Sequence, residues 1–531
     1  MRLSELLAGL PEHVHYDGPD PEITGIAYDS RRVQPGALFV AVWHPGYAAD
    51  RHQFAGAAVR AGAAAVVAQR PVDVPPGTPV VVVPDTPRAL GWLAAAFHGF
   101  PSARLGLAGV TGTDGKTTTC TMATTILEAA GYRTGMVTTV AAKTAGEWRE
   151  KLEHTSTPEA VEVQALLAET VAGGGRRAVV EATSHALDQD RLAGCEFDVA
   201  VVTRVTHEHL EYHGTYENYL AAKARLLELL RPDPRHPKME RIPKAAILNV
   251  DDGSYDYLAA RSPVPIIRYG MARDADVRAL DLQSAGWTAA CRVVSPWGTG
   301  ALRLQVPGAF NVYNALGALA AACTLGAPFA VALEALQAFR GVPGRMERID
   351  CGQPFQVIVD FAHTPDSLTQ ALDVLRALTP GRLIVVFGSA GERDRVKRPW
   401  MGRIAAERAD YFILTDEDPR LEDRHQIIAE IAQGALDAGA VEGHQFARIP
   451  DRRQAIAEAL ARARRGDTVL LAGKGHEKSI IGARDGQLHS IPWDEASVAR
   501  EELRRLGYGL PVPSAAPDAG THGPPDAHGS P

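Results

Sequence analysis

LGLAGVTGTDGKTT, residues 105–118, is the stretch that decides the fold: an apolar run passes through a glycine-rich loop into a run of threonines. Residues 105–110 predict a strand, and a helix is expected to start near Lys116. Glycines let backbone N–H groups approach phosphate oxygens, and the positive end of a helix favours an anion. The candidate ATP-binding residues of this loop are Gly112, Thr113, Gly115, Lys116, Thr117 and Thr118.

The loop departs from the common phosphate-binding pattern. Val110 stands where a glycine is expected five residues before Gly115. The lysine still supplies a mobile cation, and the hydroxyl of Thr117 can reach Mg²⁺. A structural glycine turn without any ligand is the alternative interpretation.

Apolar runs recur on both sides of this stretch. Predicted strands are 37–42, 64–68 and 79–83 before it, and 178–183, 198–203, 245–250, 357–362, 383–388, 411–415 and 468–473 after it. Helical patterns lie between them, and this alternation predicts α/β domains with a parallel, doubly wound sheet. We expect three domains, at 1–100, 101–340 and 341–510. The stretch 231–244 predicts a surface excursion, and the Pro- and Gly-rich tail 511–531 should be disordered.

Composition excludes several classes of protein. The 531 residues carry a formal charge of −8 and no long basic run, which argues against nucleic acid as a partner. The five cysteines are scattered without a CxxC pair, so we predict no zinc site, no disulfide framework and a reducing cytoplasm. The N-terminus lacks the apolar core of a signal peptide. The charge-free stretch 315–333 is broken by Gly326 and Pro328, and it predicts two short buried helices rather than a membrane span.

Acidic and histidine residues follow two of the predicted central strands. Glu181 ends one strand, where a carboxylate can hold Mg²⁺, although a lone glutamate at such a place is usually just solvated. His209 lies in THEHLEYHG, residues 206–214. Its three histidines could indicate zinc, but oxygen ligands beside a nucleotide favour Mg²⁺. Lys223, taken by itself, is a surface lysine on an amphipathic helix.

In their order along the chain, these motifs resemble those of the Mur ligase family. Within it they resemble the MurE type, which adds the third amino acid to UDP-N-acetylmuramoyl-L-Ala-D-Glu. The similarity covers nearly all of residues 20–480. It implies a three-domain Mur ligase architecture, with a central P-loop-type doubly wound sheet and a Rossmann-like C-terminal domain. It also implies ATP and Mg²⁺ as cofactors, and a carbamylated Lys223 whose added oxygens bind a second Mg²⁺.

The resemblance assigns roles residue by residue. YDSR (28–31) and PGALFVA (35–41) resemble the family's first-domain element, so Ser30 and His44 are implied to contact the UDP part of the substrate, although an ordinary turn at 29–30 is the alternative. HTSTP, residues 154–158 with Ser156 at its centre, resembles the segment that holds the muramoyl peptide, and its Thr157 is equally a candidate helix N-cap. The implied catalytic residues are Lys116, Glu181, His209 and Lys223, and further ATP contacts are Asn249, Asn311, Arg345, Asp360 and His363.

Three positions depart from the family's pattern. Glu208 and Phe361 stand where aspartate and tyrosine are usual. EDPR, residues 417–420, occupies the place of D-N-P-R, the element seen when meso-diaminopimelate is added; its Arg420 could pair with a distal carboxylate. Asp418 adds negative charge there, which leaves lysine and ornithine as alternatives and predicts that Asp418→Asn raises the use of diaminopimelate.

The resemblance predicts an ATP-dependent ligase of peptidoglycan synthesis, cytoplasmic and monomeric. Its substrates would be the UDP-N-acetylmuramoyl-dipeptide, activated as an acyl phosphate, and a free diamino acid; no nucleic acid and no membrane insertion are expected. Alternatives are a folylpolyglutamate synthase, a simple P-loop kinase or ATPase, and a non-catalytic nucleotide-binding homologue. Residues 20–100 speak against the first, because that enzyme lacks this first domain.

Overall fold

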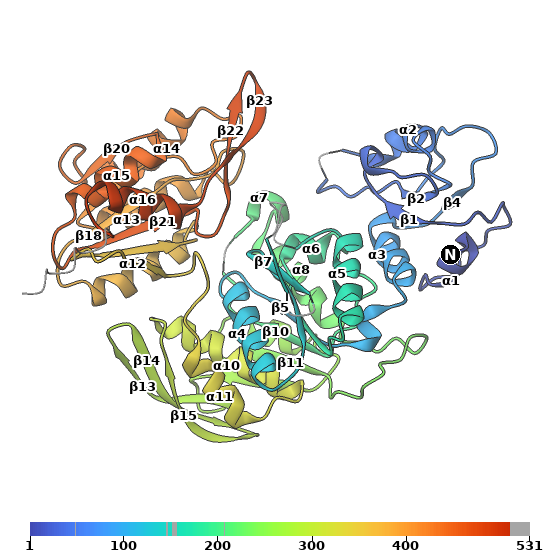
Figure 1. Ribbon diagram of the computed structural model, residues 1–531, viewed down its shortest axis with the longest axis horizontal. Helices are drawn as coiled ribbons and strands as arrows, with labels where there is room; N and C mark the ends of the chain where they lie inside the picture. The colour runs from blue at the N-terminus through green and yellow to red at the C-terminus, as the bar shows by residue number, and fades with distance from the viewer. Residues whose placement is uncertain (48, 145–146, 151–156, 207, 510–531) are drawn as a thin grey trace, which may run out of the picture.

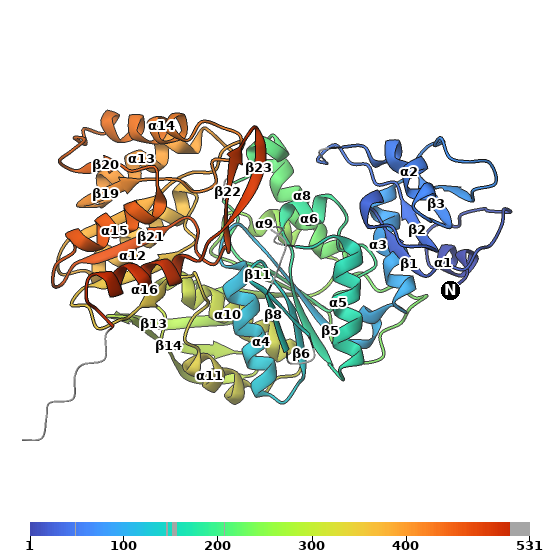
Figure 2. The ribbon, with the colours of Figure 1, turned by 45° about the horizontal axis from the view of Figure 1, so that its top comes forward.

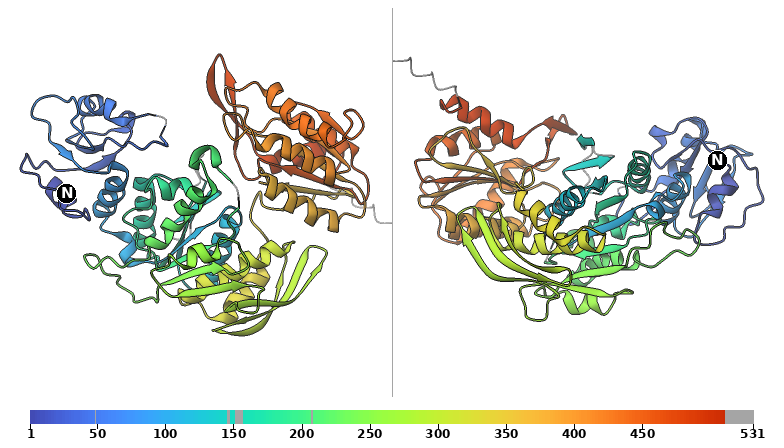
Figure 3. Two further views of the ribbon diagram at one scale, coloured as in Figure 1. Left: turned by 180° about the vertical axis from the view of Figure 1, so that it is seen from behind. Right: turned by 60° about the horizontal axis from the view of Figure 1, so that its bottom comes forward.

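The computed structural model describes residues 1–47, 49–144, 147–150, 157–206 and 208–509. Three α/β bodies follow one another along the chain, with the central body between the other two (Figures 1 and 2). The view from behind in Figure 3 places the N-terminal and C-terminal bodies on opposite sides of it. The predicted tail 511–531 and residues 154–156 lie outside the described residues.

The N-terminal body contains a parallel sheet with the strand order β1-β2-β3-β4. Every residue of β2 and β3 is apolar and buried, as expected for a parallel sheet covered on both faces. Its elements are α1 (Leu3–Ala8), β1 (Gly25–Ala27), η1 (Ser30–Arg32), β2 (Ala37–Val40), η2 (Arg51–Phe54), α2 (Ala55–Arg60), β3 (Ala65–Ala68), β4 (Val80–Val82), α3 (Thr86–Phe97) and η3 (Pro101–Arg104).

The central body has a sheet with the order β15-β14-β13-β12-β11-β10-β5-β9-β6-β7-β8. Its middle strands are parallel, whereas β14 and β15 at one edge and β7 and β8 at the other are antiparallel. The elements are β5 (Gly106–Thr111), α4 (Lys116–Ala129), β6 (Thr134–Val137), β7 (Ala141–Thr144), β8 (Glu147–Glu150), α5 (Ala160–Ala172), β9 (Arg177–Glu181), α6 (Ser184–Asp188), β10 (Val199–Val202), α7 (Leu210–His213), α8 (Tyr216–Glu228), β11 (Ala245–Asn249), α9 (Tyr255–Ala259), β12 (Ile266–Gly270), β13 (Val277–Ala285), β14 (Thr288–Ser295), β15 (Gly298–Leu304), α10 (Ala309–Thr324) and α11 (Phe329–Ala338).

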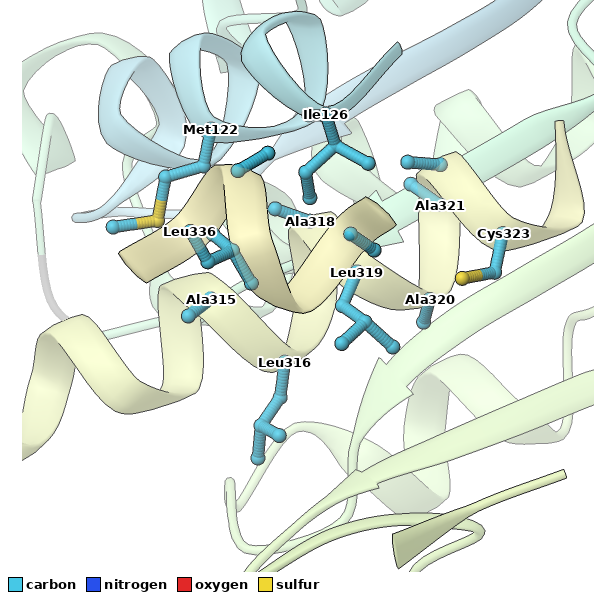
Figure 4. Close-up of a cluster of buried hydrophobic side chains, with 14 of the residues drawn as sticks. Met122, Ile126, Ala315, Leu316, Ala318, Leu319, Ala320, Ala321, Cys323 and Leu336 are labelled. Carbon is cyan, nitrogen blue, oxygen red and sulfur yellow. The ribbon is translucent and has the colours of Figure 1, made fainter. Parts of the chain in front are cut away.

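The phosphate-loop helix α4 is fixed from behind by an alanine-rich core. Figure 4 shows Met122 and Ile126 of α4 lying against the small side chains of α10, with Leu336 of α11 beside them. Alanines such as Ala318 let two helices approach closely, and close packing leaves little freedom to a buried helix. The apolar side of α4 is therefore packed closely against α10 and α11.

The C-terminal body has a sheet with the order β16-β17-β21-β18-β19-β20, parallel except for the edge strand β16. The strands β22 and β23 form a separate hairpin that projects from this body (Figure 1). The elements are β16 (Glu347–Ile349), β17 (Gln356–Asp360), α12 (Pro365–Leu378), β18 (Leu383–Phe387), α13 (Lys397–Arg408), β19 (Tyr411–Leu414), α14 (Arg424–Asp437), β20 (Phe446–Arg448), α15 (Arg452–Arg462), β21 (Thr468–Ala472), β22 (Ser479–Arg484), β23 (Gln487–Pro492) and α16 (Glu495–Arg505).

The predicted α/β class is confirmed, and each predicted strand lies where a strand is found. The three sheets fall within the three predicted domains, whose boundaries stay predictions. The antiparallel strands at the sheet edges and the parallel strands β1, β6, β12 and β20 were not predicted. The stretch 315–333 belongs to two helices with a turn between them, as expected, and no helix among the described residues is long and apolar enough to cross a bilayer.

The stretch 231–244 lies at the surface as predicted, with none of its residues buried, but it is tied to its neighbours by hydrogen bonds. The Lys238 ammonium donates to the Ser102 and Leu105 carbonyls, at 2.9 and 2.8 Å, and to Asp198 at 2.8 Å. Arg235 donates to the Leu10 carbonyl at 2.6 Å, across the boundary to the N-terminal body. The segment therefore ties the first two bodies together, which its Pro- and charge-rich composition did not indicate.

Candidate active site

The phosphate loop connects β5 to α4, and its glycines are required by geometry. Gly112 and Gly115 have φ angles of 143° and 83°, which disfavour other residues. A Cβ at Gly112 would lie 1.9 Å from the Thr203 hydroxyl, and one at Gly115 would lie 2.2 Å from Asn314 Oδ1. No side chain caps the start of α4, so its backbone N–H groups are left to face an anion.

One cavity, which we call the loop cavity, collects most of the predicted site residues. It has a volume of about 210 Å³ and is lined by both the central and the C-terminal body. Glu181, His209 and Lys223 all line it, although they come from three different parts of the central body. Its walls also contain the predicted ATP-binding residues Thr113, Gly115, Lys116, Thr117, Thr118, Asn311, Arg345, Asp360 and His363.

Asn249 lies apart from the loop cavity. It lines a neighbouring cavity of about 460 Å³, and Asp114, Gly115 and Asn314 are shared by the two. A nucleotide with its phosphates at the loop could therefore extend toward Asn249. Gly112 contributes its backbone carbonyl, which accepts a hydrogen bond from Lys223.

Glu181 is held by two threonines. It is 1% exposed, and it accepts hydrogen bonds from the Thr117 hydroxyl at 2.9 Å and from the Thr139 hydroxyl at 2.8 Å. The backbone N–H of Thr139 donates a third bond at 3.1 Å. The carboxylate is thus not the solvated strand end that its local sequence allowed. Thr139 was missed, because a lone threonine after a strand carries no signal of its role.

Lys223 is not a surface lysine. It is 1% exposed on α8, and its Nζ donates to the Gly112 carbonyl at 2.7 Å and lies 4.2 Å from the centre of the Tyr219 ring. Burial, with the nearby charge of Lys116, lowers the pKa of this amine well below its ordinary value. A neutral amine is the form that can react with CO₂.

Glu208 lies between histidines of two bodies. Its Oε1 is 3.6 Å from His209 Nε2 and 3.7 Å from His363 Nε2, and its Oε2 accepts from the Tyr219 hydroxyl at 3.1 Å. Burial alone would raise the pKa of Glu208, but His209, Lys116 and other cations lower it well below its usual range. The carboxylate therefore stays ionised inside the cavity.

Asp114 is a second acid at the loop that the sequence motifs did not single out. It faces both cavities, and its Oδ2 accepts no hydrogen bond within the described chain. Burial, with the nearby charge of Glu208, raises the pKa of Asp114 to about 6.

The residues implied to bind the UDP-linked substrate lie toward the N-terminal body. His44 lines a separate cavity, and its Nε2 is 3.6 Å from Asp188 of the central body. Ser30 begins η1, and Asp29 accepts from the Arg31 N–H, so the expected turn is present. Thr157 is not a helix N-cap, because α5 begins only at Ala160. Its hydroxyl instead donates to the Glu181 carbonyl at 2.8 Å.

A buried ion cluster lies at EDPR, residues 417–420, the predicted amino-acid-binding element. Lys474 is completely buried and donates to Asp418 Oδ1 at 2.8 Å, while Glu477 lies 2.5 Å from the same ammonium. Burial, together with the Arg420 charge, lowers the pKa of Arg393. Glu417 Oε2 is buried without a hydrogen-bond partner among the described residues. The negative charge of Asp418 is thus largely balanced by the Lys474 ammonium of the protein itself.

Comparison with known proteins agrees with the order of the three bodies along the chain. Three family models match: the Mur ligase catalytic domain at residues 22–98, the Mur ligase middle domain at 110–322 and the Mur ligase glutamate ligase domain at 344–475. A UDP-N-acetylmuramyl-tripeptide synthetase of Roseiflexus sp. (strain RS-1) is 49% identical over 96% of this chain and 100% of its own length. The chain belongs to the Mur ligase family. It is therefore an ATP-dependent amide ligase.

Other members of the Mur ligase family are similar over nearly the whole chain. A UDP-N-acetylmuramoyl-L-alanyl-D-glutamate–2,6-diaminopimelate ligase of Bacillus licheniformis is 41% identical over 95% of this chain and 100% of its own. A solved structure of a ligase with that same name has a TM-score of 0.64 and 31% identity, over 96% of this chain and 99% of its own. A folylpolyglutamate synthase of Mycobacterium tuberculosis shares the fold alone, at 16% identity and a TM-score of 0.58.

Proposed function

We propose that this ligase adds a diamino acid to UDP-N-acetylmuramoyl-L-alanyl-D-glutamate in peptidoglycan synthesis. The observation that carries the proposal is the loop cavity, in which a phosphate loop, an ionised carboxylate and a buried amine face residues of the C-terminal body. The names of the full-length relatives support this substrate. None of the comparisons supports a folylpolyglutamate synthase beyond the shared fold.

The donor set fits Mg²⁺. Thr117 and Glu181 offer oxygen atoms 2.9 Å apart, and hard oxygen ligands are those that Mg²⁺ prefers. No group of three or more His, Cys, Asp or Glu side chains among the described residues could hold a metal by itself. This suits an ion that takes part of its ligands from nucleotide phosphates. Thr117, Glu181 and His209 would hold one Mg²⁺, and carbamylated Lys223 would hold a second.

The protein's own residues carry the rest of the mechanism. Bound Mg²⁺ would offset the negative charge of the transferring phosphate. Lys116, now donating to the Thr113 carbonyl at 2.6 Å, would turn to the phosphates and add a further positive charge. The D-Glu γ-carboxylate attacks the γ-phosphate to give an acyl phosphate and ADP. The amine of the diamino acid then attacks the acyl carbon, and phosphate leaves.

The C-terminal body would present the amine. Arg420 and Arg393 offer two guanidinium groups for a carboxylate, and the buried Glu417 Oε2 lacks a donor that a substrate ammonium could supply. We place the reaction in the cytoplasm, where ATP is at hand and the five cysteines, which are free, would stay reduced. The monomeric state stays a prediction.

A phosphate-release assay tests the proposal. The protein, ATP and Mg²⁺ are incubated with UDP-N-acetylmuramoyl-L-alanyl-D-glutamate, and diaminopimelate, lysine and ornithine are offered in turn. We expect release that depends on both the UDP-linked dipeptide and one amine, and that stops when EDTA removes the metal. Release without the dipeptide would indicate an ATPase, and no release with any amine would indicate a non-catalytic nucleotide-binding protein.

A further inference from the structure

Two short segments face each other where the central and C-terminal bodies meet. One follows β10 and carries Arg204 and Glu208; the other follows β17 and carries His363 and Asp366. Arg204 Nη1 lies 3.5 Å from Asp366 Oδ2, and Glu208 Oε1 lies 3.7 Å from His363 Nε2. We call these four residues the seam.

The seam contains one ion pair, Arg204 with Asp366. Burial, with the nearby charge of Lys397, lowers the pKa of His363 to about 3, so its imidazole is neutral where it meets Glu208. A shift of the two segments would part Arg204 from Asp366 and bring Glu208 toward Asp366. Complementary charges of this kind fix register more than they add affinity.

The seam is anchored on both sides. The Arg204 carbonyl accepts from the Thr113 N–H of the phosphate loop at 2.6 Å, so Arg204 moves with the loop. Asp366 lies in the first turn of α12 and accepts from Gln370 at 2.7 Å. The seam therefore joins the ATP loop directly to the body that carries the amino-acid pocket.

Apolar contacts provide the adhesion beside the seam. Trp287, at the turn between β13 and β14, and Phe310, at the start of α10, both pack against the hydrophobic core of the C-terminal body. These contacts are not directional, whereas the Arg204–Asp366 ion pair is. This pair can therefore select an orientation without carrying much of the stability.

We propose that Arg204 and Asp366 are positioning residues, which hold the C-terminal body so that its amino-acid pocket faces the phosphate loop. This inference rests on the proposed function, because the pocket is the one that would deliver the diamino acid. Neither side chain lines the loop cavity, and Arg204 lines the neighbouring cavity that contains Asn249. Their side chains are 49% and 32% exposed, so the pair should add little to folding stability.

The test is a charge exchange. Arg204→Asp sets two carboxylates against each other, and we expect it to raise the KM for the amino acid about fivefold, the upper range for an exposed pair, with an unchanged melting temperature. Arg204→Asp combined with Asp366→Arg restores opposite charges and should return KM to near the wild-type value. Arg448→Asp breaks a comparable pair with Glu442, 2.9 Å apart within the C-terminal body, and should leave KM unchanged.

Small-angle X-ray scattering of the ligand-free proteins gives a second readout. Arg204→Asp should increase the radius of gyration, and the exchanged double variant should reverse the increase. A double variant as impaired as the single one, or single-variant KM and scattering equal to wild type, would overturn the proposal. An inactive wild-type protein would instead count against the proposed function. The scattering comparison would then still show whether Arg204 and Asp366 hold the C-terminal body in place.

Discussion

Asp418→Asn tests whether the Asp418 carboxylate interacts with the substrate amine, as the sequence predicts, or with the buried Lys474 of the protein, as the structure shows. The Asp418 carboxylate accepts from the buried Lys474 ammonium at 2.8 Å and from the Ile481 N–H at 2.9 Å. An asparagine keeps an oxygen for both donors but loses the negative charge. Hydrogen bonds to charged groups contribute about 1.5–3 kcal/mol, and because one acceptor remains we expect a loss near the lower value.

A loss of about 1.5 kcal/mol corresponds to roughly a tenfold change in an equilibrium constant. Denaturant unfolding should show this loss as a lower free energy of unfolding of the C-terminal body. Phosphate release with diaminopimelate, lysine and ornithine should fall for all three, with their ratio preserved, because the lost charge serves Lys474 rather than the substrate. Asp451→Asn, which changes an N-cap aspartate of α15, is the matched control and should leave the amine ratio unchanged.

A selective rise in diaminopimelate use, without loss of stability, would refute this reasoning. It would favour the expectation drawn from the sequence, in which Asp418 faces the substrate. Glu477 lies beside the same ammonium, and its pKa is raised to about 6, chiefly by burial. Once Lys474 is counted, Asp418 and Glu477 have little spare negative charge to offer a substrate, which leaves Glu417 as the carboxylate for a substrate ammonium.

Three further predictions concern the loop cavity. Glu181→Gln should reduce phosphate release at least about 100-fold, measured at saturating ATP, while circular dichroism stays unchanged because glutamine can still accept from Thr117. Lys223→Arg keeps a cation that cannot be carbamylated, and this variant should be inactive. Wild-type activity should fall when bicarbonate and CO₂ are removed and return when they are restored. Activity of Lys223→Arg near that of the wild type would exclude carbamylation. Because the folded pKa of Asp114 is raised to about 6, the folded protein binds the proton more tightly, so stability should fall as pH rises from about 4 to 6. Asp114→Asn should flatten that part of a pH–stability curve, and an unchanged slope would contradict the assignment.

Much of the site could be predicted because its signals are local. A phosphate loop needs backbone angles that favour glycine, so its glycines mark it in the sequence; Gly112 and Gly115 have such positive φ angles. The burial of Lys223 could not be read from its helix, because an amphipathic pattern does not say which neighbour covers the polar face. Thr139 and Asp114 carry no motif, and their roles appear only when Glu181 and the second cavity are in place.

In the fold, too, features with a local sequence signal could be predicted and features set by distant contacts could not. Strands that are continuous apolar runs were predicted, whereas the parallel strands β1, β6, β12 and β20 and the strands β13 to β15, which alternate buried and exposed residues, were not. The N-cap alternative for Thr157 was wrong because α5 starts two residues later than that interpretation required. Local capping rules cannot foresee that the Thr157 hydroxyl donates to the Glu181 carbonyl at the end of β9.

The segment 231–244 has a consequence for protein engineering. A long proline-rich connection would ordinarily be chosen for an inserted tag or a fluorescent reporter. Here an insertion near Lys238 would disturb its three hydrogen bonds and the nearby bond from Arg235 to the Leu10 carbonyl of the N-terminal body. The turn at Asp485 and Gly486 is a better place, because it tips an exposed hairpin and both residues have positive φ angles typical of a free turn.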